Sequence, residues 1–305
     1  MVNQQPYRVK TISDFHRLKG LSQPEHPLIS VINFEDIGHN EESPAHLVLD
    51  FYSIALKRHP GARIKYGQQQ YDFDEGVMFF IAPGQVFSIE MGKDVNKIRS
   101  GWILLVHPDF LWKTALSKSI KQYEYFGYAV HEALFLSEKE EHTMLGIVQH
   151  IKQEYHSNID KFSQQIIVSH LETLFNYAER FYHRQFITRK ITNHQVLERL
   201  EAFLADYFNS GDLVNKGLPG VQQIAEALHV SPNYLSGLLK VLTGLSTQQH
   251  IHEKLIEKAK EKLSTTDLSV SEVAYELGFE HPQSFSKFFK TKTNQSPQEF
   301  RRSFN

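Results

Sequence analysis

The stretch VSEVAYELGF at residues 270–279 repeats the pattern of VQQIAEALHV at residues 221–230. Val, Ala and Leu occupy matching places in the two copies, at an offset of 49 residues. After the following turn the offset becomes 50, and LSGLLK at residues 235–240 matches FSKFFK at residues 285–290. The change of offset puts one extra residue in the turn of the second copy. Such a repeat predicts two copies of one structural unit.

Each copy predicts a short helix, a tight turn and a second helix. Gly278 stands where a left-handed residue ends the first helix of copy two, and His229 holds that place in copy one. Ser231 and Pro232 then supply an N-cap and a first helical residue. A single copy fits a plain helical hairpin, but two copies joined by a helix over about 246–263 favour a double helix-turn-helix, at 221–243 and 270–293.

The second helix of each copy has an inward and an outward face. Leucines in copy one and phenylalanines in copy two recur at three and four residues and form the inward stripe. The outward residues are Asn233, Ser236, Gly237 and Lys240 in copy one, and Pro282, Gln283, Ser286, Lys287 and Lys290 in copy two. Such a helix can lie in a DNA major groove, where Asn and Gln read adenine and Lys reads guanine or holds phosphate. For either serine, a solvated surface position is an equal alternative.

The C-terminal end is locally basic although the chain is not. The formal net charge is −2, yet residues 281–305 carry five basic side chains against a single acid, Glu299. The five are Lys287, Lys290, Lys292, Arg301 and Arg302. Such a cluster can be an electrostatic footprint for nucleic acid, or a solvated helix face. The balanced total argues against a nucleoid protein that binds DNA without sequence preference.

The composition is that of an ordinary globular protein of about two domains. The chain has 305 residues, of which 41% are apolar and 22% charged, and it has no cysteine. Disulfides, Cys-ligated zinc and a cysteine nucleophile are therefore excluded. We expect no signal peptide, no membrane span and a cytoplasmic location.

Residues 1–110 read as β-rich, with short apolar runs and a turn every 8 to 12 residues. The expected strands are Leu47–Leu56, Ala62–Tyr66, Gln70–Phe73, Val77–Ala82, Val86–Glu90 and Ile98–His107. This pattern predicts a small sandwich or barrel. Tyr66, Tyr71, Trp102 and His107 can line a pocket there, but core packing explains aromatic strand residues more often, so the ligand-binding residues stay unknown.

Two helices are expected after the β-rich part. Ser137 and Glu140 form a capping box that opens a helix to about Tyr155. A second helix, from about Asp160, carries a broad apolar stripe from Phe162 to Phe181. The stripe predicts a homodimer, with packing inside its own domain as the alternative. A polar linker is expected at 186–192, between a domain at 1–185 and a helical domain at 193–305.

The C-terminal stretch resembles the AraC/XylS-type bacterial transcription regulators. The resemblance rests on residues 267–279, on FSKFFK at 285–290 and on SPQEFR at 296–301, and it covers roughly 195–303. Upstream, Gly76 and the turn Pro83-Gly84-Gln85 between short strands resemble the cupin-like effector domain of many members. The chain departs from the family pattern at Asn294, Lys254 and Gly237, where Gly, Arg and a long polar residue are usual.

The resemblance implies an α+β protein with a cupin-like barrel, two packed helices and a DNA-binding domain. It implies base reading by Asn233, Ser236, Gln283, Ser286 and Lys287, while Lys240 and Lys290 near the helix ends hold phosphate. The implied partners are promoter DNA, a small-molecule effector and, for an activator, RNA polymerase. No cofactor is expected.

Catalysis is not expected, and a cupin-type enzyme fused to a DNA-binding tail is the alternative. The chain has 17 histidines, but His39, His46 and His59 lack the His-x-His spacing of a metal-binding cupin. His250 and His252 have that spacing but fall in the predicted connecting helix. No phosphate-binding loop or nucleophile elbow is present. We therefore expect no metal site.

Overall fold

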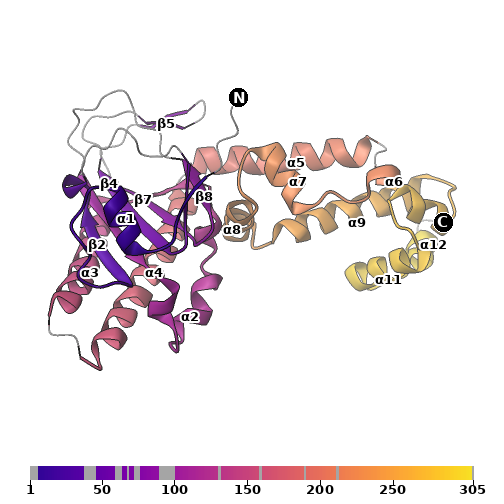
Figure 1. Ribbon diagram of the computed structural model, residues 1–305. Coiled ribbons are helices and arrows are strands. Elements are labelled where there is room, and N and C mark those ends of the chain that lie inside the picture. Colours follow the sequence, from indigo (N-terminus) through magenta and orange to yellow (C-terminus); the bar gives the residue numbers. More distant parts are fainter. Residues whose placement is uncertain are drawn as a thin grey trace. The chain divides into compact units, whose positions relative to one another are not determined.

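The computed structural model divides the chain into two compact units, Met1–Gln185 and Phe186–Asn305. Each unit is described by itself (Figure 1). The structure describes residues 6–37, 46–58, 64–66, 69–71, 76–88, 100–129, 132–157, 160–188, 190–210 and 213–303. Within them, no helix is both long and apolar enough to span a bilayer.

The N-terminal unit is built on antiparallel sheet. Its strands are β1 (Tyr7–Val9), β2 (Ile29–Asn33), β3 (His46–Leu49), β4 (Tyr52–Arg58), β5 (Ile64–Tyr66), β6 (Gln69–Tyr71), β7 (Val77–Ile81), β8 (Val86–Ser88), β9 (Ser100–Val106) and β10 (Leu134–Phe135). They form a five-stranded sheet in the order β10-β7-β4-β9-β2, a three-stranded sheet β1-β3-β8 and the hairpin β5-β6. Only the β1–β3 pair is parallel among these. The described strands form no closed barrel.

The single strand expected over Leu47–Leu56 is two strands in two sheets. The extended conformation is interrupted at Asp50 and Phe51. As a result β3 pairs with β1 and β8, while β4 pairs with β7 and β9. Phe51 is fully buried at the break and packs edge-on against Phe15. Asp50 accepts a hydrogen bond from Arg8 Nε at 2.8 Å. The apolar run therefore supplies one strand to each of two sheets, and Leu47 of β3 and Ala55 of β4 lie in the same core cluster.

Gly101 allows β9 to approach β4 closely. Its φ is 122°, and a Cβ at this position would lie 2.0 Å from the carbonyl oxygen of Leu56 on β4. Any side chain there would push the two central strands apart.

The hairpin expected around residues 67–69 is confirmed, since Ile64 pairs with Tyr71 and Tyr66 with Gln69.

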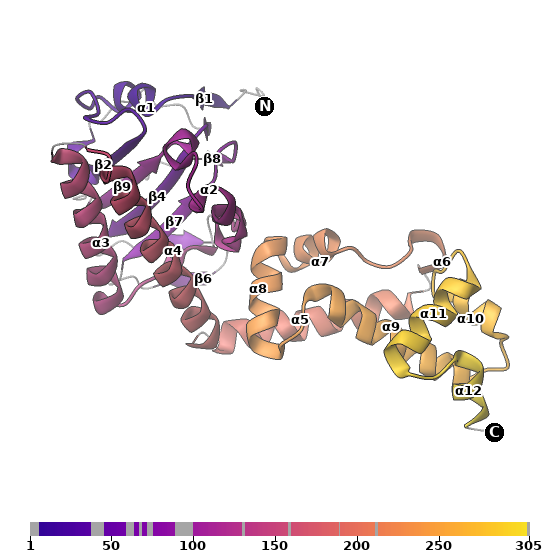
Figure 2. The same ribbon diagram turned by 90° about the horizontal axis from the view of Figure 1, so that it is seen from below.

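The N-terminal unit also contains the helices α1 (Ile12–Leu18), α2 (Leu116–Ser119), α3 (Glu138–His156) and α4 (Ser163–Thr188). Helices α3 and α4 lie across one face of the five-stranded sheet (Figure 2). The capping box that opens α3 is confirmed, since Glu140 accepts a hydrogen bond from the Ser137 backbone at 2.9 Å. Tyr155, near the end of α3, accepts a hydrogen bond from the Val31 backbone of β2.

The apolar stripe of α4 packs mainly inside its own unit. Its residues from Ile167 to Phe181 are buried or half-buried, and only Phe162 and Ile166 at its start are exposed. The stripe therefore does not provide the broad free face on which the homodimer prediction rested. Aromatic residues before β10 help to cover it: the ring of Tyr125 stacks on Tyr182 at 5.5 Å, and Phe126 meets Phe175 at 5.5 Å between centroids.

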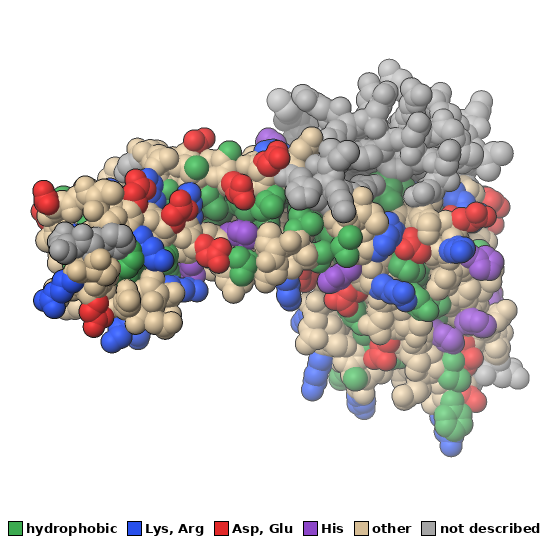
Figure 3. All heavy atoms as spheres, turned by 180° about the vertical axis from the view of Figure 1, so that it is seen from behind, with side chains coloured by type: hydrophobic (Ala, Val, Ile, Leu, Met, Phe, Trp, Pro, Cys, Tyr) green, Lys and Arg blue, Asp and Glu red, His purple; other side chains and the backbone are tan. Residues whose placement is uncertain are grey.

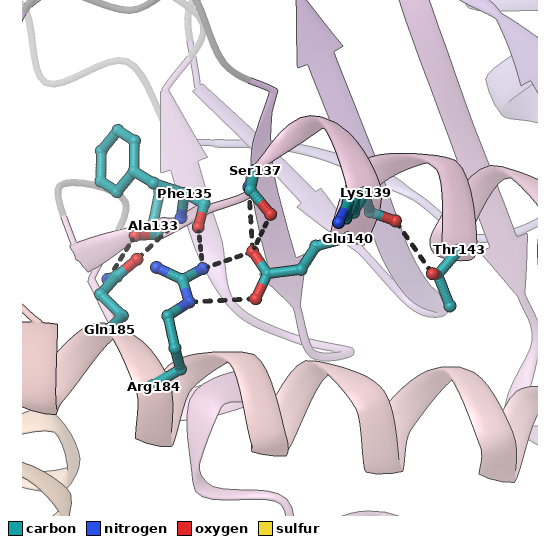
Figure 4. A network of polar contacts seen from close by, with 8 residues as sticks. All are labelled: Ala133, Phe135, Ser137, Lys139, Glu140, Thr143, Arg184 and Gln185. Carbon is teal, nitrogen blue, oxygen red and sulfur yellow. Dashed lines mark hydrogen bonds and ion pairs between the residues drawn. The ribbon is translucent and has the colours of Figure 1, made fainter.

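The end of α4 is fastened to the segment around β10 (Figure 4). Arg184 donates hydrogen bonds to the Phe135 carbonyl at 2.6 Å and to Glu140 Oε2 at 2.7 Å. Gln185 accepts from the Phe135 backbone at 2.8 Å and donates to the Ala133 carbonyl at 3.1 Å. These bonds satisfy the backbone of a two-residue edge strand and fix the position of α4.

The C-terminal unit is helical. Its helices are α5 (Lys190–Asn209), α6 (Leu213–Lys216), α7 (Val221–Leu228), α8 (Pro232–Thr243), α9 (Thr247–Thr265), α10 (Val270–Glu276), α11 (Pro282–Thr293) and α12 (Pro297–Arg302). The segment 186–192, expected as a linker, is helical where described: 186–188 end α4 and 190–192 begin α5. It contains neither Gly nor Pro to interrupt a helix. The roles assigned to the two domains stay predictions.

Candidate nucleic-acid interface

The first motif consists of α7, a turn and α8. His229 ends α7 in the left-handed conformation with a φ of 56°, as expected from its place in the repeat. Ser231 caps α8 by accepting a hydrogen bond from the Tyr234 backbone at 3.2 Å, and Pro232 is the first helical residue. The predicted caps are therefore confirmed. Helix α8 ends at Gly244, which has a φ of 76°.

Only part of the predicted outward face of α8 is free. Asn233 and Lys240 are exposed, opposite the fully buried Leu235, Leu238 and Leu239. Ser236 is half-buried, and its hydroxyl lies 3.2 Å from that of Thr247 at the start of α9. Gly237 is half-buried and has no side chain to reach out. This face offers two reaching side chains to a groove.

The second motif consists of α10, a turn and α11. Gly278 has a φ of 81°, and a Cβ there would also lie 2.7 Å from the Leu213 carbonyl oxygen of α6. Glycine is thus required both by its conformation and by the approach of α6. Asn294 ends α11 in the left-handed conformation, with a φ of 61°, at the position where the resembling family usually has Gly.

The outward face of α11 is more open. Gln283, Lys287 and Lys290 are exposed and follow a spacing of four and three residues along the helix. Phe285 and Phe289 are fully buried on the opposite face. Pro282 and Ser286 are half-buried at its edge. The sequence analysis missed Ser284 and Thr291, which are also exposed, and no signal in the sequence separates them from ordinary surface residues.

An aromatic cluster holds α11 in place. The ring of Phe285 contacts Phe279 at 5.3 Å and Phe289 at 5.8 Å between centroids, and Phe289 contacts Phe300 of α12 at 5.5 Å. Phe288 meets the ring of His252 on α9 at 5.1 Å. Helices α9, α10 and α12 therefore all fix the orientation of α11.

The exposed positive charge is concentrated in the second motif. Lys287, Lys290 and Lys292 on α11 and Arg302 on α12 are exposed, whereas α8 presents Lys240 alone. Lys and Arg side chains gather around the end of the helical unit that carries α11 (Figure 3). The second motif therefore has the stronger attraction for a polyanion.

Arg301 has a structural position instead of an exposed one. Its Nε donates a hydrogen bond to the Leu263 carbonyl oxygen at 3.1 Å, near the end of α9. Its Nη2 is buried and has no hydrogen-bond partner within the described part of the chain. Arg301 therefore connects α12 to α9, and it does not add to the exposed basic surface.

The spaced histidines of α9 have separate partners. The His250 ring lies 2.9 Å from the Thr243 hydroxyl, and His252 lies 3.2 Å from the Gln248 amide. Burial, and then the charge of Lys292, lower the pKa of His252. Among the described residues, no three His, Asp or Glu side chains are placed to hold a metal ion. His39 and His59 lie outside those residues.

Replacing Ser296 with alanine is expected to cost about 0.5–2 kcal/mol of stability. Ser296 caps α12: its hydroxyl accepts from the Glu299 backbone at 3.2 Å, and Glu299 accepts from the Ser296 backbone at 2.7 Å. Chemical denaturation of the full chain measures the loss. Ser271→Ala is the matched control, since Ser271 is exposed inside α10 and caps no helix. Equal stability of the two variants would contradict the capping role.

The cap also has a pH dependence of known sign. Hydrogen bonds from the backbone and then the hydroxyl of Ser296 lower the pKa of Glu299. A carboxyl with a lowered folded-state pKa contributes its stabilisation above the unfolded-state pKa. That contribution is lost as the pH falls through the folded-state value, so we expect the difference between Ser296→Ala and the parent chain to shrink in acid.

Residues 224–303 match the family model described as a helix-turn-helix domain. This range begins in α7, ends after α12, and contains both motifs. The C-terminal unit contains a helix-turn-helix domain. The predicted helix-turn-helix character of this region is thereby confirmed, whereas no comparison tests which of its residues contact DNA.

The relatives that match this domain are transcription regulators. The regulator YijO of Escherichia coli is 35% identical over 83 residues, which cover 27% of this chain and 29% of that protein. A regulator encoded in the cgkA 5′ region of Pseudoalteromonas carrageenovora is 34% identical over 115 residues, 38% of this chain and 63% of that protein. The chain thus spans less than two thirds of the curated relatives it matches.

A solved structure is also similar to this region. The C-terminal domain of AraT, a response regulator from Geobacillus stearothermophilus, is 30% identical to it. The match covers 35% of this chain and 84% of that chain, with a TM-score of 0.31.

Proposed function

We propose that this chain is a ligand-responsive transcription regulator that binds promoter DNA with α8 and α11 as its two reading helices. The observation that carries the proposal is the repeated motif, in which each second helix buries one stripe and presents polar side chains opposite to it. Such helices enter the major groove in helix-turn-helix proteins. Related transcription regulators share the domain.

The two reading helices have unequal tasks. On α11, Gln283 and Lys287 are exposed near the start of the helix and read base edges, while Lys290 holds phosphate. On α8, Asn233 reads and Lys240 holds phosphate, whereas Ser236 is engaged with Thr247. The remaining candidates, Gly237, Pro282 and Ser286, lie half-buried and shape the contact at its edge.

The spacing of the two motifs suits one face of a duplex. The connecting helix α9 has 19 residues and is therefore about 28 Å long at 1.5 Å per residue. Successive major grooves on one side of B-DNA are about 34 Å apart. One chain therefore reaches two adjacent grooves, and its site is not a palindrome because α8 and α11 differ.

The N-terminal unit acts as the sensor in this proposal. Its sheets and the helices α3 and α4 support a cupin-like domain for a small-molecule effector. Phe162 and Ile166 are the exposed part of the α4 stripe that a second copy could cover in a homodimer. The regulator works in the cytoplasm, where promoter DNA is, contacts RNA polymerase when it activates, and performs no catalysis with any cofactor.

Selection of DNA from a random library by the full chain tests the proposed function. We expect an enriched sequence with two blocks of different strength, separated by about one helical turn, about ten base pairs. A variant that combines Gln283→Ala and Lys287→Ala should lose the block read by α11 and keep the other. Bound DNA as random as the input would contradict the proposal.

A further inference from the structure

A cavity of about 360 Å³ lies in the N-terminal unit, beside the start of β4. Its apolar lining includes Leu111, Trp112 and Ile120, and its polar lining includes Tyr52, Asp109 and Lys121. Cavities that hold small molecules are usually of this size or larger and combine apolar walls with a few polar groups.

Trp102 and His107, two of the aromatic residues suggested by the sequence, are not among the lining residues of this cavity. Trp102 is buried in the sheet with 3% of its surface exposed, and His107 accepts a hydrogen bond from the Asp109 backbone at 3.3 Å. The side chains of Tyr66 and Tyr71 lie outside the described residues. The lining instead comes from Tyr52, the first residue of β4, and from the segment 108–121.

Tyr52 contributes its phenol group to the lining of the cavity. Only 9% of its surface is exposed, and its ring packs against Phe126 at 5.2 Å. Its side chain lines the cavity, so the hydroxyl is available to a molecule bound there. Burial raises the pKa of Tyr52, so the phenol stays protonated and can donate. A protonated phenol in the lining of a cavity can donate a hydrogen bond to an acceptor on a bound ligand.

Lys121 contributes the positively charged side chain of the cavity lining. Its ammonium forms no ion pair with a described residue, and residues 110–123 contain Lys113 and Lys118 but no acid. Asp109 is the acidic side chain of the lining, and its carboxylate is largely exposed, 3.5 Å from the His107 ring. Lys121 and Tyr52 line the same cavity, so an anion bound there has an ammonium and a phenol available to it.

The apolar side of the cavity has both a buried floor and an exposed rim. Leu111 and Ile120 are almost fully buried, at 1% and 3% exposure. Trp112 has 71% of its surface exposed, although a large aromatic ring is usually covered. A ligand with an apolar body would cover Trp112 while it contacts the floor.

We propose that this cavity is the effector site and that it takes a small amphipathic carboxylate. The apolar body of the ligand lies against Leu111, Ile120 and Trp112, and its carboxylate lies between the Tyr52 hydroxyl and the Lys121 ammonium. The proposal rests on the ligand-responsive function proposed above and names the chemical class of the effector.

Tryptophan fluorescence of the full chain tests this site. The chain has two tryptophans, and Trp102 is buried, so a change at the exposed Trp112 dominates the response to a ligand in the cavity. We expect 4-phenylbutyrate to shift the emission to shorter wavelength and to saturate, with a Kd below about 1 mM. The matched neutral amide, 4-phenylbutyramide, should bind about tenfold more weakly because it lacks the charge.

Three variants separate the proposed contacts from a general effect. Lys121→Gln and Tyr52→Phe should each weaken binding of the acid about tenfold and leave binding of the amide unchanged. Lys118→Gln is the matched control, since Lys118 is exposed on the same segment but does not line the cavity. Equal binding of acid and amide, an equal loss in Lys118→Gln, or no saturable shift with phenylbutyrate, phenylacetate or naphthoate would overturn the proposal.

The DNA measurement stays independent of this result. Selection of DNA by the full chain without ligand reports on α8 and α11 alone. Failure of the probe with successful DNA selection would overturn the effector site only. Failure of DNA selection would instead overturn the proposed function, on which the effector role of the cavity rests.

Discussion

Replacing Phe285 with alanine is expected to destabilise the second helix-turn-helix motif by about 3–5 kcal/mol. Phe285 is fully buried and contacts the rings of Phe279 and Phe289, so its removal leaves a cavity where α10 and α11 meet. Hydrogen exchange of the full chain should show lost protection in α10 and α11. Helices α7 and α8 should keep theirs, because their core is formed separately by leucines.

Phe288→Ala is the matched control for this prediction. Phe288 lies three residues further along α11 and is only half-buried, between Phe279 and His252. Its removal exposes less apolar surface and should cost clearly less than removal of Phe285. Equal protection of α11 in Phe285→Ala and in the parent chain would contradict the packing described for this motif.

Replacing Lys287 with alanine is expected to weaken specific DNA binding by about 1–3 kcal/mol, since Lys287 is exposed on the proposed reading face of α11. A loss confined to the specific site would show that Lys287 reads a base. A uniform loss on all DNA, with the salt dependence reduced by about one charge, would show that it holds phosphate. Titration of a specific and a scrambled duplex at several salt concentrations distinguishes the two.

Two further variants test whether the loss of DNA binding is specific to the exposed face of α11. Asn233→Ala should have a smaller effect than Lys287→Ala, because α8 offers fewer reaching side chains and less charge. Lys139→Ala removes the same charge from α3 in the N-terminal unit and should leave binding unchanged. If Lys139→Ala weakened binding as much as Lys287→Ala, the assignment of α11 as the main reading helix would be wrong.

The turns and caps of the C-terminal unit could be predicted because they depend on local residues. His229 and Gly278 take the left-handed conformation that the repeat assigned to them, and Asn294 takes it at the place where the resembling family usually has Gly. Ser231 caps α8 at the expected position. In each case the residue type, its spacing and the apolar run beside it indicate the same structure.

Contacts between distant segments could not be predicted in this way. Ser236 is engaged by Thr247, and Arg301 reaches the Leu263 carbonyl, 38 residues away. Both looked like free surface residues because their partners depend on how α8, α9 and α12 pack. The break of the apolar run at Asp50 and Phe51 likewise depends on the two sheets between which the chain divides it.

Hydroxyl-radical footprinting of the full chain on its selected DNA tests the central claim most directly. Two helix-turn-helix motifs joined by α9 should protect two clusters of sugars on one side of the duplex, about ten base pairs apart. The cluster under α11 should be the stronger, because the exposed lysines lie there. A single protected groove, or two equal clusters arranged as a palindrome, would contradict the account.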